Sequence, residues 1–225
     1  MLYGSDLKHL EQNATIDYRY EIVRKGIHLF SLSIPTIYFF ISQQLALCLL
    51  LPITAAFISI DTARYYIPAV SRWFYRWFGW LLRRHETDTN RKQLTGASNV
   101  LISASLCVLL FPKVIAINAF TILIISDTTS ALVGRRFGRH RFLAKSLEGS
   151  IAFFISAVIV ILIAPKVSRL PAEYVVGIIA AAIGAVVEAL PIRIDDNLSI
   201  PLAVGFSLWW LYMLLLPTLD LTLLM

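Results

Sequence analysis

Residues 126–150 contain the side chains from which a site for phosphates and a metal ion could be built. Asp127 lies in an apolar run with hydroxyl residues on both sides of it. The run ends at Gly134 and Gly138 in an arginine-rich loop, and Lys145 leads into the next apolar run. A carboxylate at the centre of a membrane span costs about 2.5–3.5 kcal/mol, so Asp127 is a candidate for function.

The spacing around Asp127 places small side chains beside the carboxylate. On a helix, Asp127, Ser130, Ala131 and Gly134 share one face. That face leaves room for a hydrated Mg²⁺ ion and its phosphates. The alternative is a helix-packing face of small residues, with Asp127 paired to an arginine.

A second acidic group lies further along the chain. Glu188 is near the end of one apolar run, and Asp195, Asp196 and Asn197 precede the next. Carboxylate and amide oxygens are hard ligands of the kind that Mg²⁺ prefers. The alternative is a solvated turn that caps the next helix. With Asp127, the predicted metal ligands are therefore Asp127, Glu188, Asp195 and Asp196.

Two basic groups could bind phosphate. Lys145 lies one helical turn before Glu148, where backbone N–H groups of the following helix could share a phosphate with it. An ordinary surface Lys–Glu pair is the alternative. Arg24 and His28 share a helix face beside Lys25 and could hold a phosphate at the membrane surface. As the basic flank of a membrane span, these residues would need no such role.

The composition is that of a membrane protein with little mass outside the bilayer. Hydrophobic residues make up 58% of the 225 residues and charged residues 15%, against about 45–50% and about 25% in soluble domains. The net charge of +6 fits a basic membrane face, and we expect no nucleic-acid partner. Cys48 and Cys107 each lie in an apolar run, which favours core packing over a disulfide or a zinc site.

The apolar runs predict an all-α bundle of about seven transmembrane helices. Their expected ranges are 20–41, 45–60, 96–111, 114–133, 149–164, 173–190 and 200–216. Residues 1–20 are expected to form a polar surface segment, 21–217 a single integral membrane catalytic domain and 218–225 a short tail. Residues 62–95 mix aromatic and basic side chains, which predicts an amphipathic helix in the membrane interface. An aromatic belt with snorkelling arginines is the alternative.

The distribution of Lys and Arg predicts the orientation of the bundle. If the N-terminus is cytoplasmic, 17 of the 20 basic residues fall on the cytoplasmic side, as the positive-inside rule requires. Acids that are far apart in the sequence then gather at the same end of their spans. These acids are Asp61, Asp127, Glu148, Glu188, Asp195 and Asp196.

Six segments together resemble the motifs of the polyprenol kinase family. That family comprises dolichol kinase, phytol kinase and CTP-dependent diacylglycerol kinase, and is distantly related to phosphatidate cytidylyltransferase. The resemblance covers residues from about 21 to 210. The segments are 24–28, 61–64, 95–98, 126–138, 145–150 and Glu188 with 195–201.

The resemblance implies a membrane enzyme that transfers the γ-phosphoryl group of a nucleoside triphosphate, usually CTP, to the hydroxyl of an isoprenoid alcohol or diacylglycerol. Mg²⁺ or another divalent cation is the implied cofactor, and catalysis consists mostly of positioning and electrostatic stabilisation. The implied catalytic residues are Asp127, Lys145, Glu148 and Glu188. The implied nucleotide and phosphate ligands are Arg24, Lys25, His28, Gly134, Arg135, Gly138, Lys145 and Asn197.

The resemblance also implies partners and a location. The partners are a lipid alcohol from the bilayer, the nucleotide and membrane lipids, and a homodimer is left open. A chain this short is expected in the inner (plasma) membrane of a prokaryote, with its active site on the cytoplasmic face.

Two other functions are alternatives. One is a CTP-dependent lipid cytidylyltransferase, disfavoured because residues 194–197 differ from the acidic tail motif of that enzyme. The other is a small transporter, disfavoured because the ionisable residues gather at one membrane face and not through the full depth.

Overall fold

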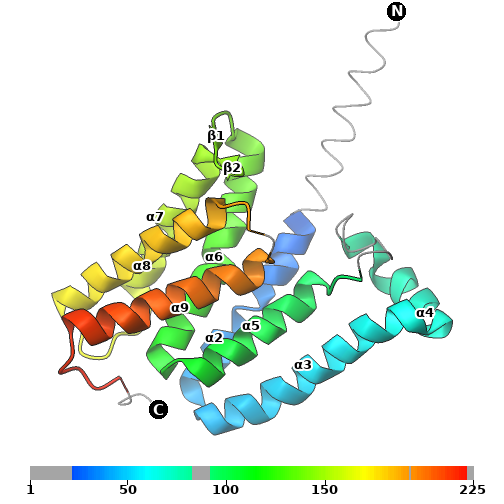
Figure 1. The fold of residues 1–225 in the computed structure, drawn as a ribbon, viewed down its shortest axis with the longest axis horizontal. Coiled ribbons are helices and arrows are strands. Elements are labelled where there is room, and N and C mark those ends of the chain that lie inside the picture. The colour runs from blue at the N-terminus through cyan, green and yellow to red at the C-terminus, as the bar shows by residue number, and fades with distance from the viewer. Residues whose placement is uncertain (1–21, 83–91, 193, 222–225) are drawn as a thin grey trace, which may run out of the picture.

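The computed structural model describes residues 22–82, 92–192 and 194–221, and these are mostly helical (Figure 1). Residues 22–30 are helical, and a 3₁₀ turn covers Gly79–Leu81. The further helices are α2 (Ser33–Phe40), α3 (Gln43–Tyr66), α4 (Pro68–Phe78), α5 (Gly96–Leu110), α6 (Lys113–Phe137), α7 (Leu147–Ile163), α8 (Pro171–Ala189) and α9 (Asp196–Leu215). Between α6 and α7 lies a short antiparallel hairpin of β1 (Arg141–Phe142) and β2 (Lys145–Ser146).

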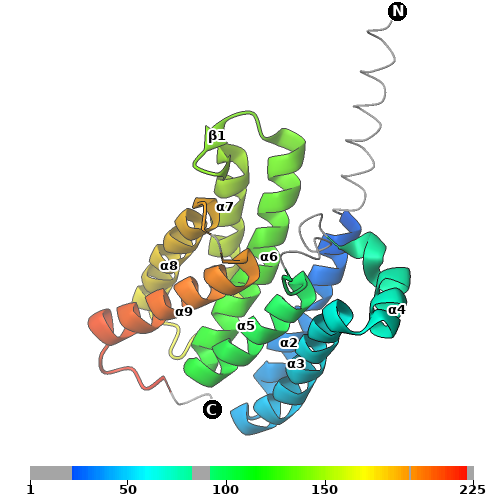
Figure 2. The ribbon, with the colours of Figure 1, turned by 45° about the vertical axis from the view of Figure 1, so that its right-hand side comes forward.

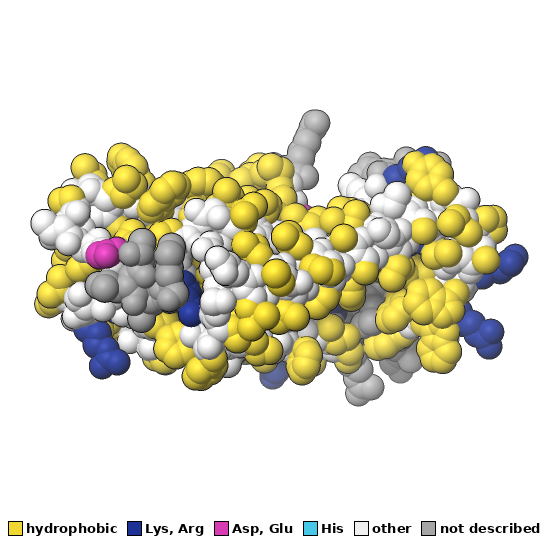
Figure 3. Space-filling view, turned by 90° about the horizontal axis from the view of Figure 1, so that it is seen from below, with side chains coloured by type: hydrophobic (Ala, Val, Ile, Leu, Met, Phe, Trp, Pro, Cys, Tyr) yellow, Lys and Arg dark blue, Asp and Glu magenta, His cyan; other side chains and the backbone are white. Residues whose placement is uncertain are grey.

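Four of these helices, α3, α6, α8 and α9, are long and apolar enough to cross a membrane. The helices α5 and α7 are apolar but shorter, with 15 and 17 residues. The protein is therefore an all-α, multi-pass integral membrane protein. Figure 3 shows one face of it, where apolar side chains are widespread and charged side chains are few.

The prediction of one continuous helix over residues 20–41 is wrong for the residues of this span that the structure describes, 22–41. The helix is interrupted at Ser31 and Leu32, which separate residues 22–30 from α2. Pro35 has no N–H group with which to continue the helical ladder to Ser31 O, and Ile34 N donates to that oxygen instead at 3.0 Å.

Helix α6 is the centre of the bundle. It packs against α2, α5, α7 and α9 (Figure 2), and 72% of its most apolar stretch is buried, against 22% in α3. Ile122, Leu123 and Ile124 are completely buried, which is the pattern of a helix that is enclosed on all sides. Ser126, Asp127 and Ser130 on α6 are consequently buried within the protein.

Helix α4 corresponds to part of the predicted interfacial segment. Phe74 is buried against the Arg64 guanidinium, whose carbon lies 4.8 Å from the ring centre. Trp73 and Trp77 are exposed, as is Trp80 in the following 3₁₀ turn. The helix therefore has one face on the protein and an aromatic face turned outward.

Candidate functional site

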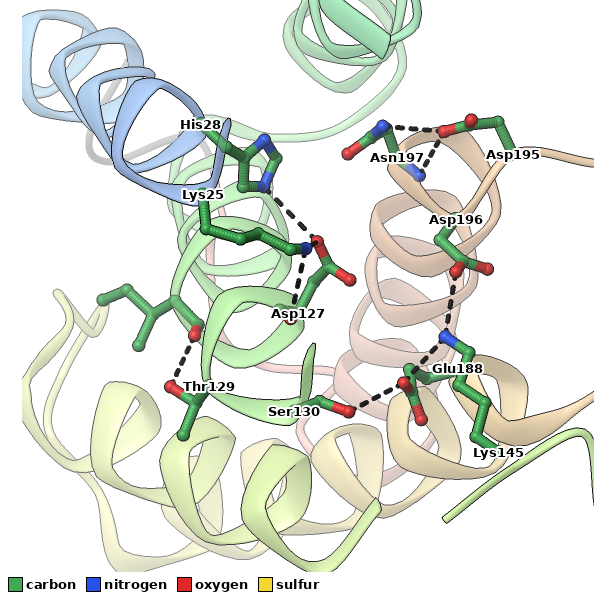
Figure 4. Close-up of polar contacts among 11 residues, drawn as sticks. Lys25, His28, Asp127, Thr129, Ser130, Lys145, Glu188, Asp195, Asp196 and Asn197 are labelled. Atoms are coloured by element: carbon green, nitrogen blue, oxygen red, sulfur yellow. Dashed lines mark hydrogen bonds and ion pairs between the residues drawn. The ribbon is translucent and has the colours of Figure 1, made fainter. Parts of the chain in front are cut away.

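Asp127 on α6 pairs with side chains from helical residues 22–30. Lys25 Nζ donates a hydrogen bond to Asp127 Oδ2 and lies 3.3 Å from the Asp127 carbonyl oxygen. His28 Nε2 lies 3.7 Å from the same carboxylate oxygen. Both Lys25 and Asp127 are buried. The alternative of a buried aspartate with a basic partner is thus found, with Lys25 in place of an arginine (Figure 4).

Lys145 is the centre of a second charged group. Its Nζ lies 2.7 Å from Glu188 Oε1 and 2.9 Å from Asp196 Oδ2. Ser130, one helical turn after Asp127 on α6, donates to Glu188 Oε1 at 2.8 Å. Residues from β2, α6, α8 and the first turn of α9 thus meet at this point (Figure 4).

The hairpin fixes the backbone of Lys145. Ala144 N donates to Ala189 O at 3.0 Å, which joins the hairpin to the end of α8. Burial disfavours the Lys145 ammonium, but the charges of Asp196 and Glu188 outweigh it and raise the pKa of this lysine above its ordinary value. Lys145 therefore remains a cation near neutral pH.

Glu148 does not join this group. Its carboxylate accepts hydrogen bonds from His140 N at 3.2 Å and lies 2.8 Å from His140 Nδ1. Ser146 instead caps α7 by accepting from Gly149 N at 3.2 Å. Glu148 therefore joins the start of α7 to His140, just before the hairpin. Its catalytic role remains a prediction, and no described contact with Lys145 supports it.

The glycines of the loop are packed against protein atoms. A Cβ atom on Gly134 would lie 2.8 Å from Ser146 Oγ, and one on Gly138 would lie 2.2 Å from the carbonyl oxygen of Gly134. Gly138 N already donates to that carbonyl oxygen at 3.1 Å. The small residues thus permit the close contact of α6, the hairpin and α7. Because protein atoms already fill the space beside Gly134 and Gly138, that space does not support the predicted contact of these glycines with phosphate.

Asp195 and Asn197 form the helix cap that was the alternative to a metal site. Asp195 Oδ1 accepts from Asn197 N at 2.9 Å and from Asn197 Nδ2 at 2.7 Å. Asn197 is buried, while the side chain of Asp196 is 36% exposed and turns to Lys145. Adjacent aspartates therefore have different surroundings.

Arg24 and Arg135 lie at the edges of the site. Arg24 is half-buried beside Lys25, and Arg135 is exposed near the end of α6. Both make contacts within the chain, and their binding of phosphate remains a prediction.

The two charged groups act on one another. The charges of Lys145 and Asp196 reach Asp127, which links the group at Lys25 to that at Lys145. Within the described ranges, no three His, Cys, Asp or Glu side chains are placed to hold one metal ion together. Mg²⁺ is commonly held by one or two carboxylates together with substrate phosphates and water. The donor set of Asp127 and Asp196 fits that chemistry.

Sequence reasoning missed the contact between Lys145 and Glu188 and the part played by Ser150. Ser150 Oγ lies 3.4 Å from Glu188 Oε2. One signal was available, because Ser150 follows Lys145 by five residues in a segment already singled out. The partner on α8 is 43 residues from Lys145, and no local pattern identifies it.

Two of the resembling segments, 61–64 and 95–98, meet in a buried polar cluster. The carboxylate of Asp61 accepts from Thr95 N at 2.9 Å, from Thr95 Oγ1 at 2.7 Å and from Ser98 Oγ. Arg64 Nε lies 3.6 Å from Asp61 Oδ1. Asp61 and Arg64 thus form an ion pair within α3, and the hydrogen bonds from Thr95 and Ser98 to Asp61 fix the start of α5 to α3.

Comparison with known proteins gives three relatives. The chain is 32% identical over 195 residues to an uncharacterized protein of Rickettsia prowazekii, covering 86% of this chain and 95% of the relative. It is 31% identical over 193 residues to an uncharacterized protein of Methanocaldococcus jannaschii, covering 83% and 91%. It is 29% identical over 164 residues to CTP-dependent diacylglycerol kinase 1 of Schizosaccharomyces pombe, covering 66% and 73%.

No family model matches the chain, and no solved structure matches it significantly. The relatives nevertheless cover 66–86% of this chain, and the kinase among them is of the kind that the six segments resemble. The chain is a distant homologue of CTP-dependent diacylglycerol kinase, an enzyme of the polyprenol kinase family.

Proposed function

We propose that this protein is a membrane lipid-alcohol kinase. It transfers the γ-phosphoryl group of a nucleoside triphosphate, CTP, to the hydroxyl of diacylglycerol or an isoprenoid alcohol. The observation that carries the proposal is the meeting of Lys25, Asp127, Lys145, Glu188 and Asp196 at one end of the helices. Two cations among three acids suit a triphosphate bound together with a divalent cation.

The two lysines have the chemistry to bind phosphate. Lys25 and Lys145 each carry an ammonium held by carboxylates, so each is oriented before a nucleotide arrives. Such preorganised charge stabilises the negative charge on the transferred phosphoryl group without reorganisation during the reaction. Mg²⁺ held by Asp127 and Asp196 would neutralise further phosphate charge when bound.

The membrane arrangement follows the same proposal. Residues 22–30 with α2 would form the first span, and α3 and α5–α9 the other six, with the N-terminus in the cytoplasm. The site then lies at the cytoplasmic face of a prokaryotic inner membrane, within one catalytic domain of residues 21–217. A lipid alcohol in the bilayer would present its hydroxyl at the same level. The homodimer remains a prediction.

An acceptor competition assay tests this function. Purified protein in mixed micelles receives CTP labelled at the γ-phosphorus, with diacylglycerol, phytol, farnesol and undecaprenol in equal amounts. We expect labelled phosphate in at least one lipid, and none when EDTA exceeds the divalent cation. Unlabelled lipid in every lane would refute the kinase, and full activity in excess EDTA would refute the metal.

A further inference from the structure

Glu188 lies near the C-terminal end of α8, where protein atoms enclose its carboxylate. The residue is 1% exposed. Its Oε1 accepts from Ser130 at 2.8 Å and from Lys145 at 2.7 Å, and Ser150 Oγ lies 3.4 Å from Oε2. Figure 4 shows the contact of Ser130 on α6 with this carboxylate. Ser150 belongs to α7, so two neighbouring helices fix the orientation of the carboxylate.

Asp196 offers a different kind of carboxylate to the same lysine. Its side chain is 36% exposed, and one of its oxygens lies 2.9 Å from Lys145 Nζ. A Mg²⁺ ion in such a site keeps several water molecules and binds substrate phosphates, so its protein ligands must be accessible. Asp196 satisfies that requirement, whereas both oxygens of Glu188 face protein donors.

The backbone reinforces the pair of Lys145 and Glu188. The hydrogen bond from Ala144 N to Ala189 O joins the residue before Lys145 to the residue after Glu188. The side-chain contact and this backbone contact hold the hairpin against the end of α8. Lys145 is therefore fixed at both its backbone and its ammonium.

We propose that Glu188 is a positioning residue that holds the Lys145 ammonium toward the phosphates and does not ligate the metal ion. This inference rests on the proposed function. It reverses the prediction of Glu188 as a metal ligand and leaves that role to the exposed Asp196 and to Asp127, whose described side-chain contacts with Lys25 and His28 both involve Oδ2. The negative charge of Glu188 weakens the attraction of Lys145 for anions, so its contribution is geometric and not a gain in nucleotide affinity.

The kinetic test uses Glu188→Gln, which keeps the shape and an acceptor oxygen but loses the charge. We expect kcat to fall at least tenfold, because Lys145 is no longer held in one place. The KM for CTP should stay the same or fall, because the site becomes less negative. In a Lys145→Ala background, Glu188→Gln should cause no further loss of kcat. A kcat within twofold of the wild type, or an additive loss in the double variant, would overturn the proposal.

A binding test reads metal ligation without turnover. Mn²⁺ affinity is measured by electron paramagnetic resonance in the presence of a CTP analogue whose γ-phosphoryl group cannot be transferred. Glu188→Gln should bind Mn²⁺ within twofold of the wild type, while Asp196→Asn should bind it at least tenfold more weakly. A tenfold loss in Glu188→Gln would make Glu188 a ligand and overturn the proposal.

Ser130→Ala tests the same idea in a variant that buries no new charge. It removes the 2.8 Å hydrogen bond to Glu188, and we expect a three- to tenfold lower kcat with unchanged Mn²⁺ affinity. Ser156→Ala is the matched control, since Ser156 bonds only to carbonyls of its own helix among the contacts described. Equal kcat in both serine variants would contradict the positioning role.

If wild-type protein transfers no γ-phosphoryl group, the proposed function fails, whereas the Mn²⁺ comparison still tests whether Glu188 is a metal ligand.

Discussion

Among the charged residues of the site, Asp127 is the one whose neutralisation should lower activity most. It lies on the most buried helix, it is paired with Lys25, and the charges of both lysines act on it. A neutral amide in its place would keep the size of the side chain and lose the attraction for both Lys25 and a divalent cation.

Asp127→Asn should therefore lower phosphoryl transfer by at least 10³-fold while the protein still inserts and purifies normally. The broken pair with Lys25 lowers the stability, but α6 keeps its apolar packing, so the loss of activity should come from misplaced charge in the site. Initial rates with γ-labelled CTP and gel filtration in detergent provide the two measurements. Wild-type turnover in this variant would remove Asp127 from the site.

The pair of Lys145 and Glu188 predicts a specific stability pattern. Lys145→Ala leaves a buried carboxylate without its cation, which costs about 3–5 kcal/mol for a fully buried pair. Because the Lys145 side chain is 31% exposed, we expect about 2 kcal/mol here. Adding Glu188→Gln should restore most of the lost stability, as measured by thermal unfolding in detergent. A double variant less stable than Lys145→Ala would contradict the pairing.

At the residue scale, the sequence indicated which side chains belong to the site better than it indicated their partners. Asp127, Lys145, Glu188 and Asp196 were all selected, because acids and lysines near apolar runs are costly without a function. Their pairing depends on contacts between segments 43 to 102 residues apart, which no local spacing encodes. Helix capping, by contrast, depends on local sequence, and the structure shows the helix cap at Asp195 that the sequence offered as the alternative to a metal site.

Helix α4 and the turn after it form an element whose exposed aromatic side chains predict a position at the membrane interface. Trp73, Trp77 and Trp80 are exposed while Phe74 faces the protein. Tryptophan is favoured at the headgroup level, where its ring is apolar and its N–H is polar.

Lipid quenching of tryptophan fluorescence tests this position. Replacing Trp209 and Trp210 with Phe leaves only the three tryptophans at residues 73–80. In vesicles, bromines near the headgroups should quench this variant more strongly than bromines near the ends of the acyl chains. The reverse variant, with Phe at those three positions, is the control. Stronger quenching from deep bromines, or none, would contradict an interfacial element.

The connection between α7 and α8 contains a lysine with an unusual pKa. Lys166 Nζ donates to Ile161 O at 2.6 Å and to Ala164 O at 2.8 Å. Burial lowers the pKa of Lys166 to about 8, although Glu173 acts in the opposite direction. In the unfolded chain the lysine pKa is about 10.4.

Between these two pKa values the unfolded chain binds more protons than the folded protein. The free energy of unfolding should therefore rise as pH increases from about 8 to about 10.4. In Lys166→Met this contribution is absent, so the stability of wild type relative to the variant should increase over that range. Thermal unfolding from pH 7.5 to 10.5 measures the difference, and parallel curves would contradict the lowered pKa.

At the element scale, apolar runs predicted the later helices closely. The expected span 149–164 is α7 at Leu147–Ile163, and 173–190 is α8 at Pro171–Ala189, because apolar length and flanking turn residues determine such helices. The first predicted span was wrong as one helix because Pro35 removes a hydrogen bond from the turn that precedes it. The hairpin was also missed, since each of its strands has only two residues.

The whole molecule places its charged site at one end of an apolar bundle. Helices α6, α8 and α9 bring their ends together there, and the hairpin and residues 22–30 supply the lysines (Figure 1). The asymmetry of Lys and Arg predicted that six acids gather at one end, and three of them, Asp127, Glu188 and Asp196, lie in this site. The sequence could not predict which lipid or nucleotide fills the site, since those depend on the shape of the assembled surface.

The position of the phosphorus that reaches the lipid tests the central proposal most directly. Purified protein, Mg²⁺ and a lipid alcohol are incubated with CTP labelled at either the α- or the γ-phosphorus, and the extracted lipid is counted. Phosphoryl transfer to a hydroxyl predicts label in the lipid from γ-labelled CTP alone. Label from α-labelled CTP would mean that a cytidylyl group is transferred, and would contradict the kinase.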